Sequence, residues 1–374
     1  MDQRQRLKEA QTVVVKVGTR TLTHATGKLN LRYMEKLVRE LADLVNQGRN
    51  VVLVSSGAVG AGIGKLGLEK KPQSIPEKQA VAAVGQSLLI QMYEKLFAEY
   101  GLVVAQVLLT RDDFNNRKRY LNSRNALKAL LGYGVIPIIN ENDTVAVEEI
   151  EFGDNDSLSA LVASILDADL LVLLTDTGGL YSANPKLDES AKLLSVVEQI
   201  TPEIRKLAGE TCESLATGGM VTKLLAAEVV AKSGIPMVIA NGSDAVVLQR
   251  ILDGEDVGTL FCAGKKCLES RKRWIAYGQM AHGRIIVDGG AKNALLADGK
   301  SLLPSGILEV IGDFEQGEMV AIEDHCGNEF ARGLVNYSSG DLQLIKGLRT
   351  EKATDVLQRT CGEAVHRNNM VVNI

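Results

Sequence analysis

The sequence predicts a three-layer α/β/α sandwich with a largely parallel central sheet, followed by a small, mostly β C-terminal domain. Short apolar runs alternate with longer stretches of helical period up to about residue 260. These runs are continuously apolar rather than alternating, which is typical of parallel strands buried on both faces. After about Lys272, short strand-like runs separated by glycines replace this pattern. Strand–helix repetition also places ligands at the carboxyl ends of the strands.

Six runs have the composition of buried strands, namely residues 13–17, 51–55, 103–109, 135–139, 170–174 and 236–240. Between them, apolar residues recur every three or four positions, as on one face of a helix. These helical stretches are residues 34–45, 77–100, 119–131, 157–166 and 220–233. Gly101 and Gly234 follow two of them, at positions where a C-terminal cap is expected.

The C-terminal third has strand-like runs at residues 284–287, 308–311, 319–322 and 371–373, with frequent glycines between them. This change in the pattern of apolar runs and glycines predicts a first domain over residues 1–263, a linker over residues 264–279 and a second domain over residues 280–374.

Composition narrows the class of protein. The 374 residues are 45% hydrophobic and 24% charged, which is ordinary for a globular chain, and the net charge of −4 argues against a strongly basic nucleic-acid binder. Five cysteines without a C-x-x-C pair favour reduced thiols over a disulfide framework. The polar N-terminus does not resemble a signal peptide, and no apolar run approaches the ~18 residues that span a bilayer. We therefore expect a cytoplasmic protein without structural zinc.

Two lysines next to glycine-bearing turns indicate an anion site. Lys16 lies in VVVKVGT (13–19), and Lys223 ends TGGMVTK (217–223). Glycines let backbone N–H groups turn toward an anion, and an ammonium adds a compact positive charge. No G-x-x-x-x-G-K-[ST] stretch occurs, so a nucleotide triphosphate site here lies outside the P-loop class. A solvated strand-end lysine and a plain helix-start loop remain the alternatives.

The segment SSGAVGAGIG (55–64) follows the second predicted strand. It runs into GIGKLG (62–67), a formal G-x-G-x-x-G, but its position after the second strand argues against a dinucleotide fingerprint. We expect a glycine-rich anion cradle or a flexible substrate loop. Ser56 is either a donor to a carboxylate or phosphate oxygen, or a helix N-cap.

Two clusters rich in Asn and Asp follow the fourth predicted strand, NEND (140–143) and GDNDS (153–157). One interpretation is a turn followed by an N-cap, with Asp156 capping the next helix. The other is that amides and carboxylates converge to hold an amino group, a carboxylate or a hydrated metal. A carboxylate between the two lysines would also hold their ammonium groups in place.

A long polar loop, TDTGGLYSANP (175–185), follows the most apolar predicted strand. Its length and its Gly-Gly pair suit a cover over a nucleotide base, whereas a surface loop anchored by Tyr181 is an equally simple interpretation.

Taken together, these motifs resemble the amino-acid kinase family over nearly the whole chain. The matching segments are residues 15–19, 54–58, 86–87, 108–111, 140–143, 153–156, 175–176 and 217–223. The C-terminal third resembles the PUA domain that bacterial members carry, joined through ESRKRW (269–274).

The resemblance implies ATP-dependent phosphorylation of the γ-carboxylate of L-glutamate to L-glutamyl 5-phosphate, with Mg²⁺ on the phosphates. It implies that Lys16 and Lys223 bind the triphosphate and stabilise the transferring group, and that Asp156 orients both lysines. Glutamate would be held by Ser56, Asp143 and Asn155. The residues implied to line the nucleotide are Thr175, Asp176, Thr217, Gly218, Gly219, Met220, Val221 and Thr222, together with Lys16 and Lys223.

The same resemblance implies the opening step of proline biosynthesis and feedback inhibition by proline. It also implies a dimer or tetramer, and the lability of the product suggests hand-off to glutamyl phosphate reductase. Aspartokinase, acetylglutamate kinase and uridylate kinase are the alternatives within the same fold.

RNA binding through the PUA-like domain is the alternative from another class. Residues 280–374 contain 9 Lys and Arg against 13 Asp and Glu, a net charge of −4, so the whole excess negative charge lies there. This is opposite to the basic surface that phosphate binding requires.

Overall fold

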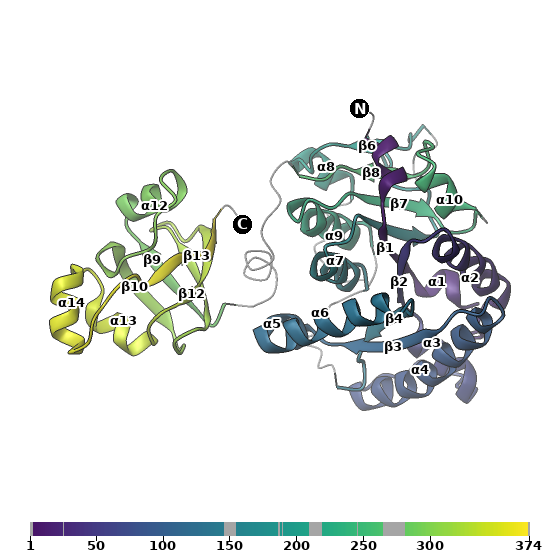
Figure 1. The fold of residues 1–374 in the computed structure, drawn as a ribbon, viewed down its shortest axis with the longest axis horizontal. Coiled ribbons are helices and arrows are strands. Elements are labelled where there is room, and N and C mark those ends of the chain that lie inside the picture. Colours follow the sequence, from purple (N-terminus) through teal and green to yellow (C-terminus); the bar gives the residue numbers. More distant parts are fainter. Residues whose placement is uncertain are drawn as a thin grey trace. The chain divides into compact units, whose positions relative to one another are not determined.

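The computed structural model describes residues 3–24, 26–145, 155–185, 188, 190–208, 219–244, 246–264 and 281–372. The chain divides into two compact units (Figure 1). The larger comprises Met1–Asp113 and Lys118–Cys267, and the smaller comprises Leu268–Ile374 with Phe114–Arg117. Residues 265–280 lie outside the described ranges, so the predicted linker limits of 264 and 279 stay a prediction.

The larger unit is built on an eight-stranded sheet with the strand order β3-β4-β2-β1-β5-β7-β8-β6. The six strands from β3 to β7 run parallel, β8 is antiparallel to β7, and β6 is parallel to β8. The strands are β1 Thr12–Val17, β2 Asn50–Ser55, β3 Val104–Leu109, β4 Ile136–Glu141, β5 Leu170–Thr175, β6 Val196–Val197, β7 Met237–Asn241 and β8 Thr259–Phe261. The predicted largely parallel sheet is confirmed, and the six predicted strands correspond to β1–β5 and β7.

Helices cover both faces of this sheet, which gives the predicted three layers (Figure 1). They are η1 Gln5–Glu9, α1 Thr19–Leu22, α2 Leu31–Asn46, α3 Ala58–Leu66, α4 Ile75–Ala98, α5 Arg111–Asn115, α6 Arg117–Gly132, α7 Asn155–Leu166, α8 Pro202–Leu207, α9 Met220–Lys232 and α10 Val247–Leu252. Helix α4 begins at a capping box in which the Ser74 hydroxyl accepts from the backbone of Glu77, whose carboxylate accepts in return from Ser74 N. Gly234 follows α9 with φ 77°, as the predicted C-terminal cap requires.

Alternate residues of β1 face opposite layers, because successive side chains of a strand point to opposite sides. Val13, Val15 and Val17 pack in one apolar cluster with residues of α2, α4 and α10. Lys16 faces the other layer, where α7 contacts both β1 and α9. This alternation directs the one charged side chain of β1 toward the start of α7.

Gly62, one of the glycines after β2, serves helix packing. The interpretation of residues 55–64 as a flexible loop was wrong beyond Gly57, whereas the anion cradle stays a prediction. Helix α3 begins at Ala58 and packs closely on α4. A Cβ on Gly62 would lie 2.0 Å from the carbonyl oxygen of Val81, and one on Gly85 would lie 1.7 Å from that of Ala58. Side chains at these glycines would therefore force the two helices apart.

The smaller unit contains a five-stranded sheet with the order β10-β9-β11-β12-β13, in which only β9 and β11 pair in parallel. Its elements are β9 Gly283–Val287, α12 Gly289–Leu296, η2 Pro304–Gly306, β10 Ile307–Gly312, β11 Met319–Glu323, β12 Glu329–Val335, α13 Ser339–Ile345, α14 Thr350–Leu357 and β13 Val365–Val372. Four strands correspond to predicted runs. The sequence missed β12 and the three helices.

Two glycines explain part of this difference. The sequence pattern treats the glycines of this region as separators between strand-like runs, but Gly333 lies within β12, where a Cβ would meet the side chain of Val365 of β13 at 2.4 Å. Gly289 was interpreted in the same way, although it begins α12 behind an Asp288 cap that accepts from Ala291 N. Glycine therefore marks close strand approach and a helix start here, as well as turns.

Within the described ranges, no helix has the length and apolar character needed to cross a membrane.

Candidate active site

Three charged side chains from distant parts of the chain meet at the carboxyl edge of the larger sheet. Lys16 is the last but one residue of β1, Asp156 is the second residue of α7, and Lys223 is the fourth residue of α9. Lys16 Nζ lies 2.6 Å from Asp156 Oδ1, and Lys223 Nζ lies 3.0 Å from Asp156 Oδ2. The structure thus brings together the three residues that the sequence singled out for the phosphate site.

Asp156 is fully buried and does not act as the N-cap that one interpretation proposed. Besides the two lysines, the hydroxyl of Thr222 donates to Asp156 Oδ2 over 3.0 Å. Lys223 Nζ also donates to the carbonyl of Gly219 at 3.4 Å. Asp156 therefore links the start of α7 with the first turn of α9.

The charges of this cluster are interdependent. Burial by itself raises the pKa of Asp156, but the ammonium groups of Lys16 and Lys223 outweigh it and lower the pKa to about 2. The carboxylate is consequently ionised at neutral pH. One carboxylate against two ammonium groups leaves a formal excess of one positive charge at a nearly water-free position, which suits an incoming anion.

The neighbouring residue, Asn155, organises a second group of polar side chains. Its Nδ2 donates to Ser56 Oγ at 2.8 Å, to Asn140 Oδ1 at 2.8 Å and to the carbonyl of Ser55 at 3.2 Å. Ser56 and Asn155 are therefore brought together as expected. The sequence placed Asn140 in a polar cluster without assigning it a role, and its position at the end of a buried strand was the available signal.

The turn that carries Ser56 is fixed by backbone geometry. Gly57 has φ 98°, a conformation that glycine adopts without steric cost, and α3 begins at the next residue. Ser56 N donates to the carbonyl of Val17 over 3.2 Å. The end of β2 is thereby tied to the end of β1, directly after Lys16.

Asp143 lies two residues beyond β4 and is half-buried. It follows the strand that carries Asn140 and thus lies at the same edge of the sheet. Its contact with a substrate stays a prediction.

The residues predicted to line the nucleotide fall into three groups, at the start of α9, at the end of β5 and at Asp176, the residue after β5. Gly219 is the N-cap residue of α9, and Met220, Val221 and Thr222 form its first turn, whereas Thr217 and Gly218 lie outside the described residues. Thr175 ends β5, and its hydroxyl accepts from Thr177 N at 3.0 Å.

Asp176 is the third group, and its side chain is 51% exposed. Its carboxylate pairs with Arg20 of α1 at 3.3 Å. The sequence did not single out Arg20, because nothing in its local pattern connects it with residue 176.

No set of three or more His, Cys, Asp or Glu side chains that could hold a metal occurs among the described residues. Both oxygens of Asp156 already contact ammonium groups.

A family model described as the amino acid kinase family matches residues 11–241, more than half of the chain. The chain belongs to the amino acid kinase family. A model of the PUA domain matches residues 283–357, which lie in the smaller unit. The amino acid kinase match includes Lys16, Asp156 and Lys223, so the buried charge cluster lies within the kinase domain.

Relatives cover nearly the full length of this family member. The glutamate 5-kinase of Moorella thermoacetica is 56% identical over 367 residues, covering 98% of this chain and 97% of the relative. The glutamate 5-kinase of Caldanaerobacter subterraneus subsp. tengcongensis is 54% identical over 361 residues, covering 96% and 97%. Among solved structures, the carbamate kinase from Giardia lamblia bound to AMP-PNP matches with a TM-score of 0.50 and 19% identity, covering 68% of this chain and 99% of that chain. At that identity it supports the fold alone.

The buried cluster predicts the effect of Asp156→Asn. At pH 7 the variant leaves two buried ammonium groups without their counter-charge, and we expect a loss of about 3–5 kcal/mol in the free energy of unfolding. Because the folded pKa of Asp156 is lowered to about 2, this stabilisation is present above the ordinary pKa of 3.8 and is lost as pH falls toward 2. Urea unfolding at pH 7 and at successively lower pH measures the difference.

The control Glu255→Gln removes the exposed pair with Arg250 and should cost less than about 1 kcal/mol. Equal losses in both variants would contradict the prediction.

Proposed function

We propose that this chain is a glutamate 5-kinase, which transfers the γ-phosphoryl group of ATP to the γ-carboxylate of L-glutamate and forms L-glutamyl 5-phosphate. The observation that carries the proposal is the Lys16–Asp156–Lys223 cluster next to the Ser56–Asn155 pair, in a member of this kinase family. Near-full-length relatives at 56% and 54% identity bear the name glutamate 5-kinase, which supports this choice of acceptor.

The acceptor explains why the described residues around the cluster include no obvious general base. A γ-carboxylate is already ionised at neutral pH, so no proton has to be removed before attack. The barrier instead comes from bringing two anions together. Lys16 and Lys223 provide positive charge at the point where negative charge develops, and Asp156 holds both ammonium groups in position before the substrates arrive.

The two substrates occupy opposite sides of this cluster in the proposal. Ser56, Asn155 and Asp143 align glutamate, with the Ser56–Asn155 hydrogen bond fixing two of the three groups. The nucleotide contacts Thr175, Asp176 and the segment from Thr217 to Lys223. The first turn of α9 supports this assignment, since backbone N–H groups at the start of a long helix attract phosphate. Mg²⁺, bound with ATP, supplies further neutralisation of the phosphates.

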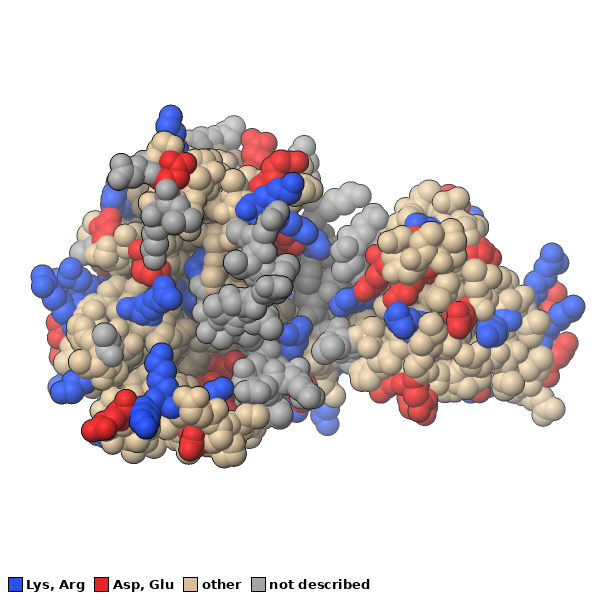
Figure 2. Space-filling view, turned by 180° about the vertical axis from the view of Figure 1, so that it is seen from behind, with Lys and Arg blue, Asp and Glu red and all other residues tan. Residues whose placement is uncertain are grey.

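We extend the proposal to the enzyme's setting. The reaction is the first step of proline biosynthesis, in the cytoplasm, and free proline inhibits at or beside the glutamate site. The enzyme forms a dimer or tetramer and passes its labile product to glutamyl phosphate reductase. RNA binding by the smaller unit is disfavoured by its net charge. On the face in Figure 2, the described Lys and Arg side chains of this unit are interspersed with Asp and Glu.

ADP release in the presence of ATP, Mg²⁺ and a panel of acceptors tests the proposed function. We expect turnover with L-glutamate and little or none with aspartate, N-acetylglutamate or UMP, together with inhibition by added proline. A clear preference for another acceptor would replace glutamate in the proposal and leave the phosphoryl-transfer site intact.

Removal of either ammonium group tests the charge cluster. We expect Lys16→Ala and Lys223→Ala each to lower kcat by roughly 10²–10⁴, the range for loss of a positioned electrostatic group. Lys128→Ala serves as a control, because this half-exposed lysine of α6 contacts Asp167 at 3.8 Å, away from the cluster. Near-normal kcat in both cluster variants would refute their assigned role.

Asp143→Ala tests the division between the two substrates. We expect the KM for glutamate to rise far more than the KM for ATP, because Asp143 is assigned to the amino-acid substrate alone. Initial rates measured with each substrate varied in turn give the two KM values. Equal rises in the two KM values would remove Asp143 from the glutamate site.

A further inference from the structure

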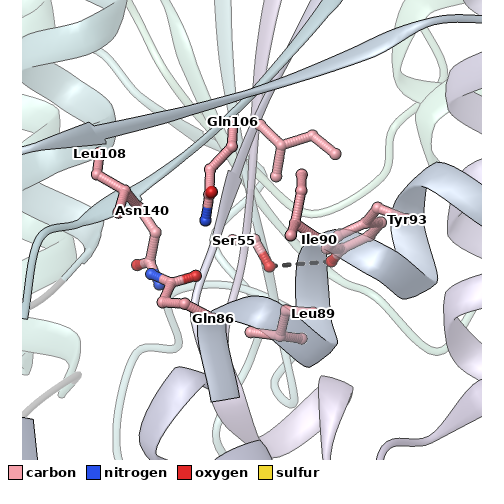
Figure 3. Close-up of a pocket in the computed structure, with 9 residues that line it drawn as sticks. Ser55, Gln86, Leu89, Ile90, Tyr93, Gln106, Leu108 and Asn140 are labelled. Atoms are coloured by element: carbon pink, nitrogen blue, oxygen red, sulfur yellow. Dashed lines mark hydrogen bonds between the residues drawn. The ribbon is translucent and has the colours of Figure 1, made fainter. Parts of the chain in front are cut away.

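A small cavity lined by both polar and apolar side chains lies next to Ser55, between α4 and the strands β2, β3 and β4. Figure 3 shows its lining, which comprises Ser55, Gln86, Leu89, Ile90, Tyr93, Gln106, Leu108, Ile138 and Asn140. Its free volume of about 10 Å³ is close to the space that one water molecule needs, so it is far too small for an amino acid. We therefore expect the polar side chains that line the cavity to support one another and not to bind a substrate. Two of them, Ser55 and Asn140, also contact Asn155.

Ser55 is held from three directions. Its backbone pairs with Val17 in the parallel β1–β2 register, and its carbonyl accepts from Asn155 Nδ2. Its hydroxyl lies 2.9 Å from the hydroxyl of Tyr93, the bond drawn in Figure 3. Tyr93 is fully buried, and burial raises its pKa, so the phenol remains protonated and can donate at any ordinary pH.

Helix α4 contacts the same turn at a second point. Gly85, eight residues before Tyr93, lies against the carbonyl of Ala58, the first residue of α3. That approach leaves no space for a Cβ. One rigid helix therefore fixes both ends of residues 55–58, through the Tyr93 hydroxyl at Ser55 and through the close packing at Ala58. Ser56 and Gly57 lie between these two fixed points.

We propose that Tyr93 is a positioning residue for the amino-acid substrate, acting through Ser55 on the turn that carries Ser56. This inference rests on the proposed function, in which Ser56 and Asn155 hold the acceptor. The hydroxyl of Tyr93 fixes Ser55 from the α4 face, while Asn155 fixes it from the α7 face. Loss of the hydroxyl lets the turn shift toward the cavity, which weakens the Ser56–Asn155 arrangement. We expect a smaller effect on the charge cluster, because Lys16 faces α7 on the other side of the sheet from Tyr93.

Tyr93→Phe tests the inference because it removes one oxygen atom and keeps the ring. We expect the KM for the acceptor to rise about three- to tenfold, the fold-change that corresponds to one hydrogen bond of ordinary net strength. The KM for ATP should stay within about twofold of wild type, since the two substrates lie on different sides of the cluster.

Tyr337→Phe is the matched control. Tyr337 is a buried tyrosine of the smaller unit whose hydroxyl accepts from the backbone N–H of Gly362 at 2.7 Å. We expect it to lower thermal stability about as much as Tyr93→Phe while leaving both KM values unchanged. A rise in acceptor KM of less than twofold for Tyr93→Phe, or equal rises for acceptor and ATP, would overturn the inference.

Ser55, the hydrogen-bond partner of Tyr93, provides a second test that does not depend on how well Tyr93→Phe folds. Ser55→Ala should raise the acceptor KM in the same way, whereas Ser55→Thr, which keeps a hydroxyl, should retain most of the wild-type value. In the double variant Tyr93→Phe/Ser55→Ala, the rise should be clearly smaller than the product of the two single rises, because both remove one bond. Multiplicative effects would mean that the two hydroxyls act independently.

The wild-type enzyme is assayed with the acceptor panel first, so that a failure of the proposed function can be distinguished from a failure of the inference about Tyr93. Absence of turnover with glutamate would sink the proposed function alone. The positioning role of Tyr93 is then judged from the KM of whichever acceptor the wild-type enzyme phosphorylates, and an unchanged KM there would sink the inference alone.

Discussion

The kinase unit is organised around one buried carboxylate that holds two ammonium groups. Asp156 contacts Lys16 at 2.6 Å and Lys223 at 3.0 Å, and all three side chains are almost fully removed from water. Removal of the carboxylate from this cluster would leave two buried ammonium groups without a counter-charge, at a cost of several kcal/mol. The cluster thereby joins the strand β1 to the helices α7 and α9.

Because successive side chains of a strand point to opposite faces, the charge cluster and the hydrogen bond between Ser55 and Tyr93 lie on different faces of the sheet. Lys16 faces α7 and α9, where it meets Asp156. Ser55 ends the adjacent strand in register with Val17, and its side chain faces α4, where it meets Tyr93. The charge cluster and the support for the turn at Ser56 thus belong to opposite layers. Asn155 bridges them, because its neighbour Asp156 belongs to the charge cluster while its own amide reaches Ser55 and Ser56.

Sequence patterns predicted what depends on local order along the chain. Continuous apolar runs gave the positions of β1 and β5 within one residue, and the glycine-flanked lysines indicated an anion site. Contacts across long separations left no local trace. Tyr93 has the spacing of an ordinary core residue of α4, and its hydroxyl bond to Ser55, 38 residues away, is invisible in that periodicity. Gly62 and Gly85 were ambiguous for the same reason, since glycine in a sequence does not reveal whether a turn or a neighbouring helix requires it.

In the proposed function, the excess positive charge acts on the phosphate and not on the alignment of the acceptor. With Asp156 ionised, its pKa lowered to about 2, the cluster carries one uncompensated ammonium charge in a nearly water-free position. In the proposed function, an incoming phosphate supplies the missing negative charge. Its attraction is strongest where the carboxylate already holds the two ammonium groups in position. The exposed Arg20–Asp176 pair at the same edge contributes much less, because water screens both partners. In the proposed function, charge thus favours a phosphate at the cluster, whereas the acceptor depends on the geometry of Ser56 and Asn155. These two side chains carry no formal charge, so their alignment depends on the hydrogen bond between them and on the helices behind them.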